Sequence, residues 1–475
     1  MIKKFYITTP IYYVNDKPHI GSAYPTIAAD VVARFYRHAG VDTFLLTGTD
    51  EHGSKIEAAA KAAGKEPQKF ADEMAAKFSF AWDSLGIAPD DFIRTTELRH
   101  KVAVAKFLKK LKDSGKIYEG EYEGLYCVGH EAFIKESDLD AAGLCPDHKT
   151  KPEKLKEKNW FFKLSEYQGI LESRIKNNEL RIEPESRRNE VLSFLKQGLE
   201  DVAISRPNVK WGIELPWDQS QTVYVWIEAL CNYISALGYP NGEYFKKYWP
   251  ADVHLIGKDI IRFHCVIWPA LLDAAGLSWP KKVFAHGFFT IDGQKISKSL
   301  GNVIDPNDLV AKYGSDTVRY LLLREIPFGE DGDFSFSKLE TRYEGDLANG
   351  LGNLFSRVAN LIATNLDGQL PDLVPSPRKF DGVDEMTANF RFHEALARIW
   401  EEVAWANRYV DETKPWDAAK KDPKLFGVVM ANLAALILEI AKKLAPYMPE
   451  TTEKIRVALS AEKIVKPEPL FPRLN

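Results

Sequence analysis

The stretch KKFYITTPIYYVNDKPHIGSAYPTIAADVVARFYRHAG, residues 3–40, contains the pattern that decides the fold. Its first part, as far as YYV, is typical of a buried strand. Its last part is typical of a helix, because apolar side chains recur at helical spacing at Ile27, Ala28, Val31, Val32 and Phe35. A strand that passes directly into a helix is where α/β proteins bind phosphate groups. We therefore expect an α/β fold with a ligand site at this turn.

The turn itself contains Pro18, His19, Gly21 and Ser22. Gly21 has no Cβ, so a phosphate or a flat purine ring can approach the backbone. His19 can donate a hydrogen bond to a phosphate oxygen, and the start of the helix offers N–H groups. On these residues alone, an ordinary turn capped by Ser22 is the alternative.

Composition is typical of a soluble globular protein with several domains. The chain has 475 residues, of which 45% are hydrophobic and 27% charged, and this length suggests three or four domains. A net charge of −4 argues against a generally basic, DNA-coating protein, but allows a local basic face that binds a structured RNA.

Four cysteines make no disulfide framework, so we expect a reducing, cytoplasmic location. The start of the chain has no signal-peptide pattern, and polar residues interrupt the apolar run at 426–444, so we expect a core helix there and no membrane span.

The order of the predicted elements divides the chain into regions. Strands and helices alternate at the start and again after an interruption, which implies a doubly wound, Rossmann-type parallel sheet. The interruption contains short aromatic strands and cysteine–histidine pairs, which indicate an inserted module. The last region keeps a helical period, as an all-α helix bundle does. We expect the two halves of the sheet at 1–115 and 206–280, the connective insertion at 116–205, a region with a lysine loop at 281–335, and the helical domain at 336–475.

A second polar stretch, DGQKISKSLGN at 292–302, places Lys295 and Lys298 three residues apart among Gly, Ser and Asn. Such a loop is positively charged, and it suits a triphosphate whose charge moves to a leaving pyrophosphate. A solvated surface loop is the alternative. A Walker-type phosphate loop is excluded, because GTDEHGSK at 48–55 has Ser54 where that motif requires lysine.

Together the two stretches resemble the two signatures of class I aminoacyl-tRNA synthetases, "HIGH" and "KMSKS". They stand here in the same order, as HIGS at 19–22 and KISKS at 295–299. Ser22 departs from the signature, which has a second histidine there; a hydroxyl can donate one hydrogen bond but carries no charge. The longer segments TPIYYVNDKPHIG, FLLTGTDEHG, VYVWIEALCNY, HLIGKDIIRFHCVIWPALL and HGFFTIDGQKISKSLGNVIDP are similar to methionyl-tRNA synthetases, and this resemblance covers almost the whole chain.

The resemblance implies a methionine–tRNA ligase that acts in two steps. It would activate L-methionine with Mg-ATP to methionyl-adenylate and pyrophosphate, then transfer the methionyl group to the 3′-terminal adenosine of tRNA(Met). Catalysis would rest on alignment and charge stabilisation by His19, Lys295 and Lys298, without a side-chain nucleophile. The region at 281–335 would also contact the tRNA stem. The alternatives are another class I aminoacyl-tRNA synthetase, a small HxGH-type nucleotidyltransferase, and a non-catalytic tRNA-binding paralogue.

The same resemblance assigns the substrate sites. The residues expected to form the methionine pocket are Ile11, Tyr13, Trp226, Ala229, Leu230, Tyr233, Ile260, Phe263 and His264, with Asp50 for the ammonium group. A long apolar pocket with few polar anchors suits an unbranched thioether, and a buried amine requires a carboxylate. The residues expected to bind ATP are His19, Gly21, Ser22, Glu214, Gly257, Asp259 and Lys298. For each aromatic residue taken singly, core packing is the alternative.

Two residue pairs in the insertion are candidate metal ligands. They are Cys127 with His130, and Cys145 with His148, each pair separated by two residues. Two such pairs on short turns are what a tetrahedral zinc ion requires, so we expect a structural zinc knuckle. A metal-free remnant is the alternative.

The helical end of the chain contains candidates for reading RNA. Asn349, Asn353 and Arg357 are four residues apart, on one helical face, and Trp416 follows Pro415 at a helix start. Amide, guanidinium and aromatic groups can recognise unstacked bases, and the resemblance implies that these residues bind the methionine anticodon. Helix surface and a buried tryptophan are the alternative. The chain stops near the end of this bundle, so we expect a monomer.

Overall fold

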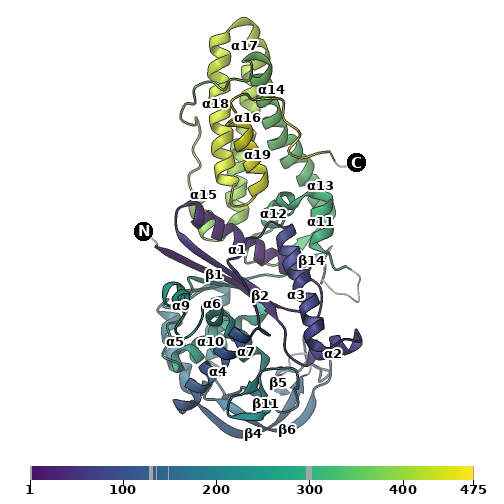
Figure 1. The fold of residues 1–475 in the computed structure, drawn as a ribbon, viewed down its shortest axis with the longest axis vertical. Coiled ribbons are helices and arrows are strands. Elements are labelled where there is room, and N and C mark those ends of the chain that lie inside the picture. The colour runs from purple at the N-terminus through teal and green to yellow at the C-terminus, as the bar shows by residue number, and fades with distance from the viewer. Residues whose placement is uncertain are drawn as a thin grey trace.

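The computed structural model describes residues 3–127, 132–134, 136–147, 149–291, 293–295 and 302–473 of the 475-residue chain. Figure 1 shows an elongated molecule, with an α/β part below and a column of helices above that ends at α17. The predicted α/β fold with a parallel sheet is confirmed, because six strands lie in the order β3-β2-β1-β12-β13-β7. Their bounds are β1 Lys4–Tyr13, β2 Asp42–Asp50, β3 Asp91–Arg94, β7 Arg181–Glu183, β12 Val253–Gly257 and β13 Lys282–His286.

Every neighbouring pair of strands in this sheet is parallel, and helices cover both of its faces. Phe5 and Ile7 of β1 belong to one apolar cluster, whereas Tyr6 between them belongs to the other. Successive side chains of a strand point to opposite faces, so the strands of a sheet buried on both faces are nearly continuous apolar runs. In such a sheet, ligands bind at the carboxyl ends of the strands.

The helices around the sheet form where apolar residues recur at helical spacing. Their bounds are α1 Ile20–His38, α2 Ser54–Ala62, α3 Pro67–Ser84, α4 Leu98–Asp113, α5 Gln168–Lys176, α6 Glu185–Leu195, α7 Val225–Leu230, α8 Asn232–Ser235, α9 Glu243–Tyr248 and α10 Trp268–Ala274. The helical pattern that starts at Ser54 is divided into α2 and α3, because Gly64 turns the chain at a φ of +66°.

Three small sheets accompany the main one. The first, in the order β5-β4-β6-β8, consists of β4 Ile117–Cys127, β5 Ala132–Ile134, β6 Glu153–Phe162 and β8 Val202–Ala203. The second, β10-β11-β9, consists of β9 Ser205–Arg206, β10 Glu214–Leu215 and β11 Asp218–Val223. The third, β15-β14-β16, consists of β14 Phe289–Ile291, β15 Gln294–Lys295 and β16 Gly332–Phe334.

The region boundaries expected from the sequence differ from the sheet at two places. Strand β7 lies within 116–205 but pairs in parallel with β13, so part of the expected insertion is an edge strand of the main sheet. Strand β13 lies within 281–335 but pairs with β12, so the main sheet extends past residue 280. Both strands are short, and a run of three to five residues has too little periodicity to show which sheet it joins.

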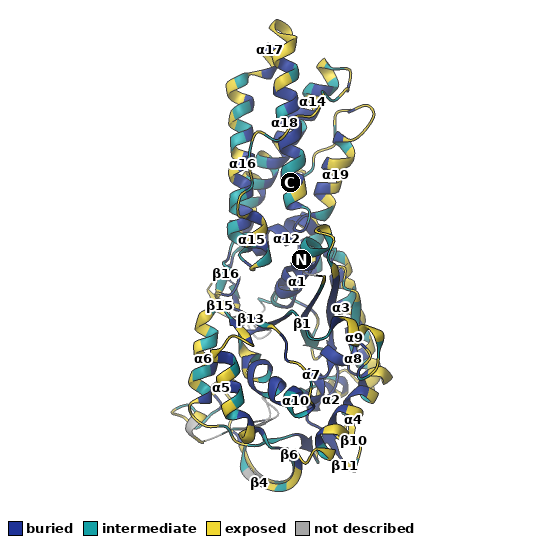
Figure 2. Ribbon diagram, turned by 90° about the vertical axis from the view of Figure 1, so that its left-hand side faces the viewer, coloured by how far each residue is buried: buried dark blue, intermediate teal, exposed yellow. Residues whose placement is uncertain are grey.

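The remaining helices form the column in the upper part of Figure 1 and the group of shorter helices at its base. They are α11 Pro306–Tyr313, α12 Ser315–Arg324, α13 Phe336–Arg342, α14 Asn353–Asn365, α15 Val383–Ala388, α16 Phe392–Thr413, α17 Pro415–Lys421, α18 Pro423–Leu444 and α19 Pro449–Leu459. Helix α18 is long and apolar enough to cross a membrane, but most of it is buried against its neighbours, and Figure 2 shows its dark blue surface inside the column. It is therefore a core helix, as the sequence predicts.

Candidate functional site

The candidate phosphate site lies at the N-terminus of α1, where His19 is the N-cap residue. Its ring Nδ1 accepts a hydrogen bond from the Gly21 amide at 3.0 Å. In the neutral ring the proton is therefore on Nε2, which can donate to a ligand. Burial lowers the pKa of His19, so the ring is neutral near pH 7. The turn thus offers a neutral donor beside the amides of a helix N-terminus.

Ser22 forms the second half of this cap. Its hydroxyl donates to the His19 carbonyl at 2.7 Å and accepts from the His19 amide at 3.1 Å. The side chain is buried, and its proton is used inside the turn. These hydrogen bonds are those of an ordinary turn capped by Ser22, which the sequence left open as the alternative. The contact between Ser22 and ATP stays a prediction.

The segment that follows the lysine loop is attached to this turn. The Ile20 amide donates to the Ile304 carbonyl at 3.1 Å, and Lys17 pairs with Asp305 at 3.0 Å. Lys295 lies in β15, but its side chain is outside the described part of the chain, and so is all of Lys298. The structure therefore places Ile304 and Asp305, which follow the second signature in the chain, beside the turn of the first.

The predicted methionine pocket is gathered around α7, α8 and two short helical segments, Lys258–Ile260 and Phe263–Ile267. The rings of Trp226 and Phe263 are stacked, with centroids 4.4 Å apart. Ala229 and Leu230 are buried. The members that belong to or pack against one apolar cluster are Ile11, Tyr13, Trp226, Leu230, Tyr233, Ile260 and Phe263.

Two of the residues expected in the pocket, Tyr233 and His264, are hydrogen-bonded to each other. His264 Nδ1 lies 3.0 Å from the Ile260 carbonyl, so it carries the proton and donates to it. His264 Nε2 then accepts from the Tyr233 hydroxyl at 2.7 Å. Burial lowers the pKa of His264 to about 4, so the pair is uncharged at neutral pH.

The other substrate candidates lie at the carboxyl ends of the central strands. Tyr13 of β1 is in register with Asp50 of β2, and Asp50 is 5% exposed. Gly257 ends the neighbouring strand β12, and a Cβ there would lie 2.5 Å from the Asp259 carboxylate. Glu214, by contrast, is an exposed residue of the separate β10-β11-β9 sheet.

A buried charged group on α7 was not predicted. Glu228 on α7 is 0% exposed; its carboxylate lies 2.7 Å from His52 Nδ1 and 3.0 Å from His100 Nε2. Burial alone would raise the pKa of Glu228, but the two histidines hold it below its usual range. His100 also bonds to Ser235 at 2.8 Å. The signal in the sequence was a single glutamate within the apolar run VYVWIEAL.

The RNA-reading candidates lie in the upper column. Asn349 and Asn353 are exposed, but Asn349 is in a π-helical segment, Tyr343–Gly352, which leads into α14. Arg357 pairs with Asp411 at 2.8 Å, and its guanidinium lies 5.7 Å from the centre of the Trp416 ring. Trp416 is 41% exposed, so it is not a core residue. It belongs to α17, at the end of the column far from the sheet (Figure 1).

The metal candidates are described only in part. Cys127 ends β4, and it and Cys145 are both buried, whereas His130 and His148 lie outside the described residues. Within the described ranges, no group of three potential ligands is found that could hold a metal ion.

Known proteins resemble the chain along most of its length. The family described as "tRNA synthetases class I (M)" matches residues 5–152 and 145–359. Methionine–tRNA ligase of Thermotoga maritima is 45% identical over 99% of this chain and 80% of its own, and that of Rickettsia felis is 46% identical over 98% and 93%. The solved structure of Mycobacterium tuberculosis methionyl-tRNA synthetase in complex with methionyl-adenylate has a TM-score of 0.94 at 38% identity, covering 99% of this chain and 100% of that one.

The free state of the M. tuberculosis enzyme gives a TM-score of 0.87 at 35% identity, again over 100% of this chain. The sequence and structure comparisons thus both cover nearly the whole chain. The chain belongs to the methionyl-tRNA synthetase family of class I tRNA synthetases.

Proposed function

We propose that the chain is a methionine–tRNA ligase. The observation that carries the proposal is the grouping of the predicted pocket residues around one apolar cluster, with stacked Trp226 and Phe263 rings and a polar pair, Tyr233 and His264, that is already hydrogen-bonded within the protein. A thioether side chain can enter such a pocket without leaving a polar group unsatisfied. The solved relative that contains methionyl-adenylate supports the same substrate class.

In the first step, the methionine carboxylate attacks the α-phosphate of ATP and pyrophosphate leaves. Asp50 holds the ammonium group at the carboxyl end of β2. His19 donates from Nε2 to the phosphates, beside the amides of α1, and Mg²⁺ accompanies ATP as part of the substrate. Gly257 and Asp259 are the candidates for the ribose, and Lys295 and Lys298 for the charge that develops on pyrophosphate.

In the second step, a ribose hydroxyl of the terminal adenosine of the tRNA takes the methionyl group from the adenylate. The column, with Asn349, Asn353, Arg357 and Trp416, is the candidate for anticodon binding. What supports this assignment is the exposure of Trp416 beside an arginine, since exposed aromatic and guanidinium groups stack on unpaired bases.

The test is pyrophosphate exchange into ATP, measured with each of the twenty amino acids in turn. The proposal expects exchange with methionine alone. Exchange that depends on leucine, valine or cysteine would indicate another class I synthetase. Absence of exchange with every amino acid, in a chain that binds tRNA, would indicate a non-catalytic paralogue.

The proposal also includes one structural zinc ion, held by Cys127, His130, Cys145 and His148. Two buried thiols and two imidazoles form a donor set that tetrahedral zinc accepts, and the ion would fix the tip of the β4–β6 sheet. Metal analysis of the purified chain should find about one zinc per chain. A metal-free chain, together with an unchanged Tm after Cys145→Ala, would indicate the remnant instead.

A further inference from the structure

The β14–β15 hairpin, from which the lysine loop continues, is held by a side chain on a neighbouring strand. Strand β16 pairs in parallel with β14, with Thr290 opposite Asp333. A single carboxylate oxygen, Asp333 Oδ1, accepts from the Thr290 hydroxyl at 2.7 Å and from the Gly293 amide at 2.7 Å. Thr290 is the register partner of Lys295 across the hairpin. One oxygen therefore fixes both the strand and the corner of this hairpin.

The backbone at Gly293, at the corner of the hairpin, has little conformational freedom. Gly293 has a φ of +75°, a conformation that favours glycine, so its amide direction is set by the turn. The hydrogen bonds, first that from Gly293, lower the pKa of Asp333. Asp333 is therefore a carboxylate at neutral pH, with its charge directed at the hairpin.

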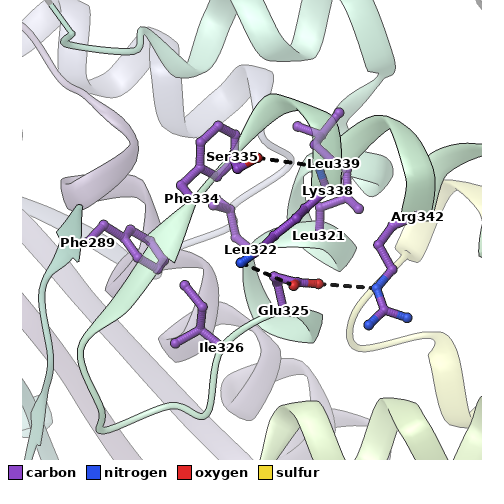
Figure 3. A pocket seen from close by; sticks show the side chains of 10 residues that line it. All are labelled: Phe289, Leu321, Leu322, Glu325, Ile326, Phe334, Ser335, Lys338, Leu339 and Arg342. Atoms are coloured by element: carbon purple, nitrogen blue, oxygen red, sulfur yellow. Dashed lines mark hydrogen bonds and ion pairs between the residues drawn. The ribbon is translucent and has the colours of Figure 1, made fainter. Parts of the chain in front are cut away.

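The opposite face of the same strands is fixed by packing. Side chains alternate along β16, so Phe334 points away from the side of Asp333. Figure 3 shows Phe289 and Phe334 lining a pocket with Leu321, Leu322 and Ile326 of the α12 region. At its edge Glu325 pairs with Arg342 at 3.1 Å and with Lys338 at 3.9 Å, so α13 is held as well. Strands β14 and β16 are thus packed against α12 and α13, and Asp333 attaches the hairpin to β16.

The residues just before Asp333 connect β16 to the candidate ribose site at Gly257 and Asp259. Asp331 pairs with Lys258, the residue between Gly257 and Asp259, and accepts from the Phe288 amide at 2.8 Å. Gly287 lets the chain pass close to this segment, since a Cβ there would lie 2.1 Å from the Glu330 carbonyl. The segment at 330–334 thus joins β12, where ATP is expected, to the hairpin that leads to the lysines.

We propose that Asp333 is a positioning residue for amino-acid activation, which fixes the backbone of Lys295 through the β14–β15 hairpin. This inference rests on the proposed function. Asp333 does not touch substrate; it acts through the hairpin. Cationic groups stabilise a transition state only when they are held in place beforehand, and a misplacement of about 1 Å can cost about a hundredfold in rate.

The test compares two substitutions at this position. Asp333→Ala removes the acceptor of both hydrogen bonds, whereas Asp333→Asn keeps an oxygen that can accept both. In methionine-dependent exchange, Asp333→Ala should lower kcat by about tenfold or more, with the methionine KM changed less than about twofold. Asp333→Asn should stay within about threefold of the unchanged chain.

A second variant removes the same contact from the other side. Thr290→Val keeps the shape of the side chain and loses only the hydroxyl, so it should lower kcat less than Asp333→Ala does. The double variant should be no slower than Asp333→Ala alone, because the bond between Thr290 and Asp333 is already absent in Asp333→Ala. Glu340→Ala is the matched control, an exposed carboxylate on α13 that pairs with Lys312 and should leave exchange unchanged.

Three results would overturn the inference. They are an Asp333→Ala variant with unchanged kcat, equal losses in the Asn and Ala variants, and additive effects of Thr290→Val and Asp333→Ala. If Asp333→Ala does not fold, as judged by its Tm, unchanged exchange in Thr290→Val is the overturning result. An unsubstituted chain without methionine-dependent exchange would instead contradict the proposed function itself.

Discussion

At the residue scale, the absence of a side chain at Gly257 lets the Asp259 carboxylate lie close to the backbone at the end of β12. A Cβ at this position would lie 2.5 Å from Asp259 Oδ1, so the carboxylate has to move in any other variant. Gly257→Ala should therefore raise the KM for ATP by about tenfold, the scale of one charge-assisted hydrogen bond. The methionine KM, measured in the same exchange assay, should change little. Equal changes in both KM values would mean that Gly257 affects the whole sheet edge.

His264 makes stability depend on pH. Its pKa in the folded chain is about 4, whereas an unfolded histidine has a pKa of about 6.5, so the unfolded state binds more protons between these values. The free energy of unfolding should therefore fall as the pH falls from about 6.5 to about 4. His254 and His286, whose pKa values burial also lowers, contribute to the same fall.

Urea denaturation of the unsubstituted chain and of His264→Gln, at several pH values, measures this contribution. The variant should lose less stability over this range, because glutamine does not titrate. An equal slope for the two chains would contradict the assignment of a neutral, buried imidazole to this position.

The sequence could predict which residue types enter the site, but not how they bond to each other. Tyr233 and His264 were both expected in the methionine pocket, but the expected polar members were Tyr13 and His264. The bond between the Tyr233 hydroxyl and His264 Nε2, at 2.7 Å, follows only from the fold. Ser22 shows the opposite case, because its capping bonds are local and the sequence already offered the cap as an alternative.

At the scale of elements, Glu228 determines how α7 is held. This helix carries Trp226, Ala229 and Leu230 on the pocket wall, and the buried Glu228 bonds it to His52, just after β2, and to His100 of α4. Removing one partner of a buried charged group costs about 3–5 kcal/mol. Glu228→Ala should lower the free energy of unfolding by that amount in urea titrations and raise the methionine KM.

The matched comparison for this variant is Glu243→Ala, an exposed carboxylate on the nearby helix α9 that pairs with Lys246. It should change the free energy of unfolding by no more than about 1 kcal/mol, as exposed ion pairs do. If Glu228→Ala is as stable as this control, the buried network does not hold α7.

Long elements were predictable because their period is visible, and short or irregular ones were not. The helical pattern of α16 and α18 spans 22 residues in each helix, enough to show which face is buried. Strand β7 has three residues, and its place in the sheet depends on β13, about a hundred residues later. The turns before α14 are π-helical, whereas the sequence predicted a regular helix there, because residue spacing does not distinguish the two.

At the scale of the whole molecule, the residues proposed for anticodon binding are separated from those proposed for activation. Trp416 lies in α17 at the end of the column, and the sheet lies at the other end (Figure 1). Trp416→Ala should therefore leave ATP–pyrophosphate exchange intact and raise the KM for tRNA about tenfold or more, since stacking on a base is worth about 1–3 kcal/mol. A parallel loss of exchange and aminoacylation would mean that Trp416 stabilises the fold.

A buried ion pair joins the α/β part to the base of the column. Arg319 of α12 and Asp30 of α1 are both 0% exposed and lie 2.7 Å apart. Arg319 also donates to the carbonyls of Tyr447, at 2.8 Å, and Pro446, at 2.9 Å, between α18 and α19. The helix that begins at the phosphate turn is thereby fixed to the base of the column.

The direction of the column relative to the sheet depends on these contacts of Arg319. Helix α16 has 22 residues, which corresponds to a length of about 33 Å, so a rotation of about 5° at the base moves the far end by about 3 Å.

Arg319→Met keeps most of the side-chain volume but loses these bonds, while Asp30 keeps Arg34 as a partner at 2.7 Å. The variant should therefore fold and keep exchange within about threefold, because the substrate residues at the sheet edge are untouched. Aminoacylation should show a KM for tRNA raised about tenfold, since the RNA-binding end is displaced from the site of transfer. A loss of exchange equal to the loss of aminoacylation would show that Arg319 supports the sheet and α1 rather than the direction of the column.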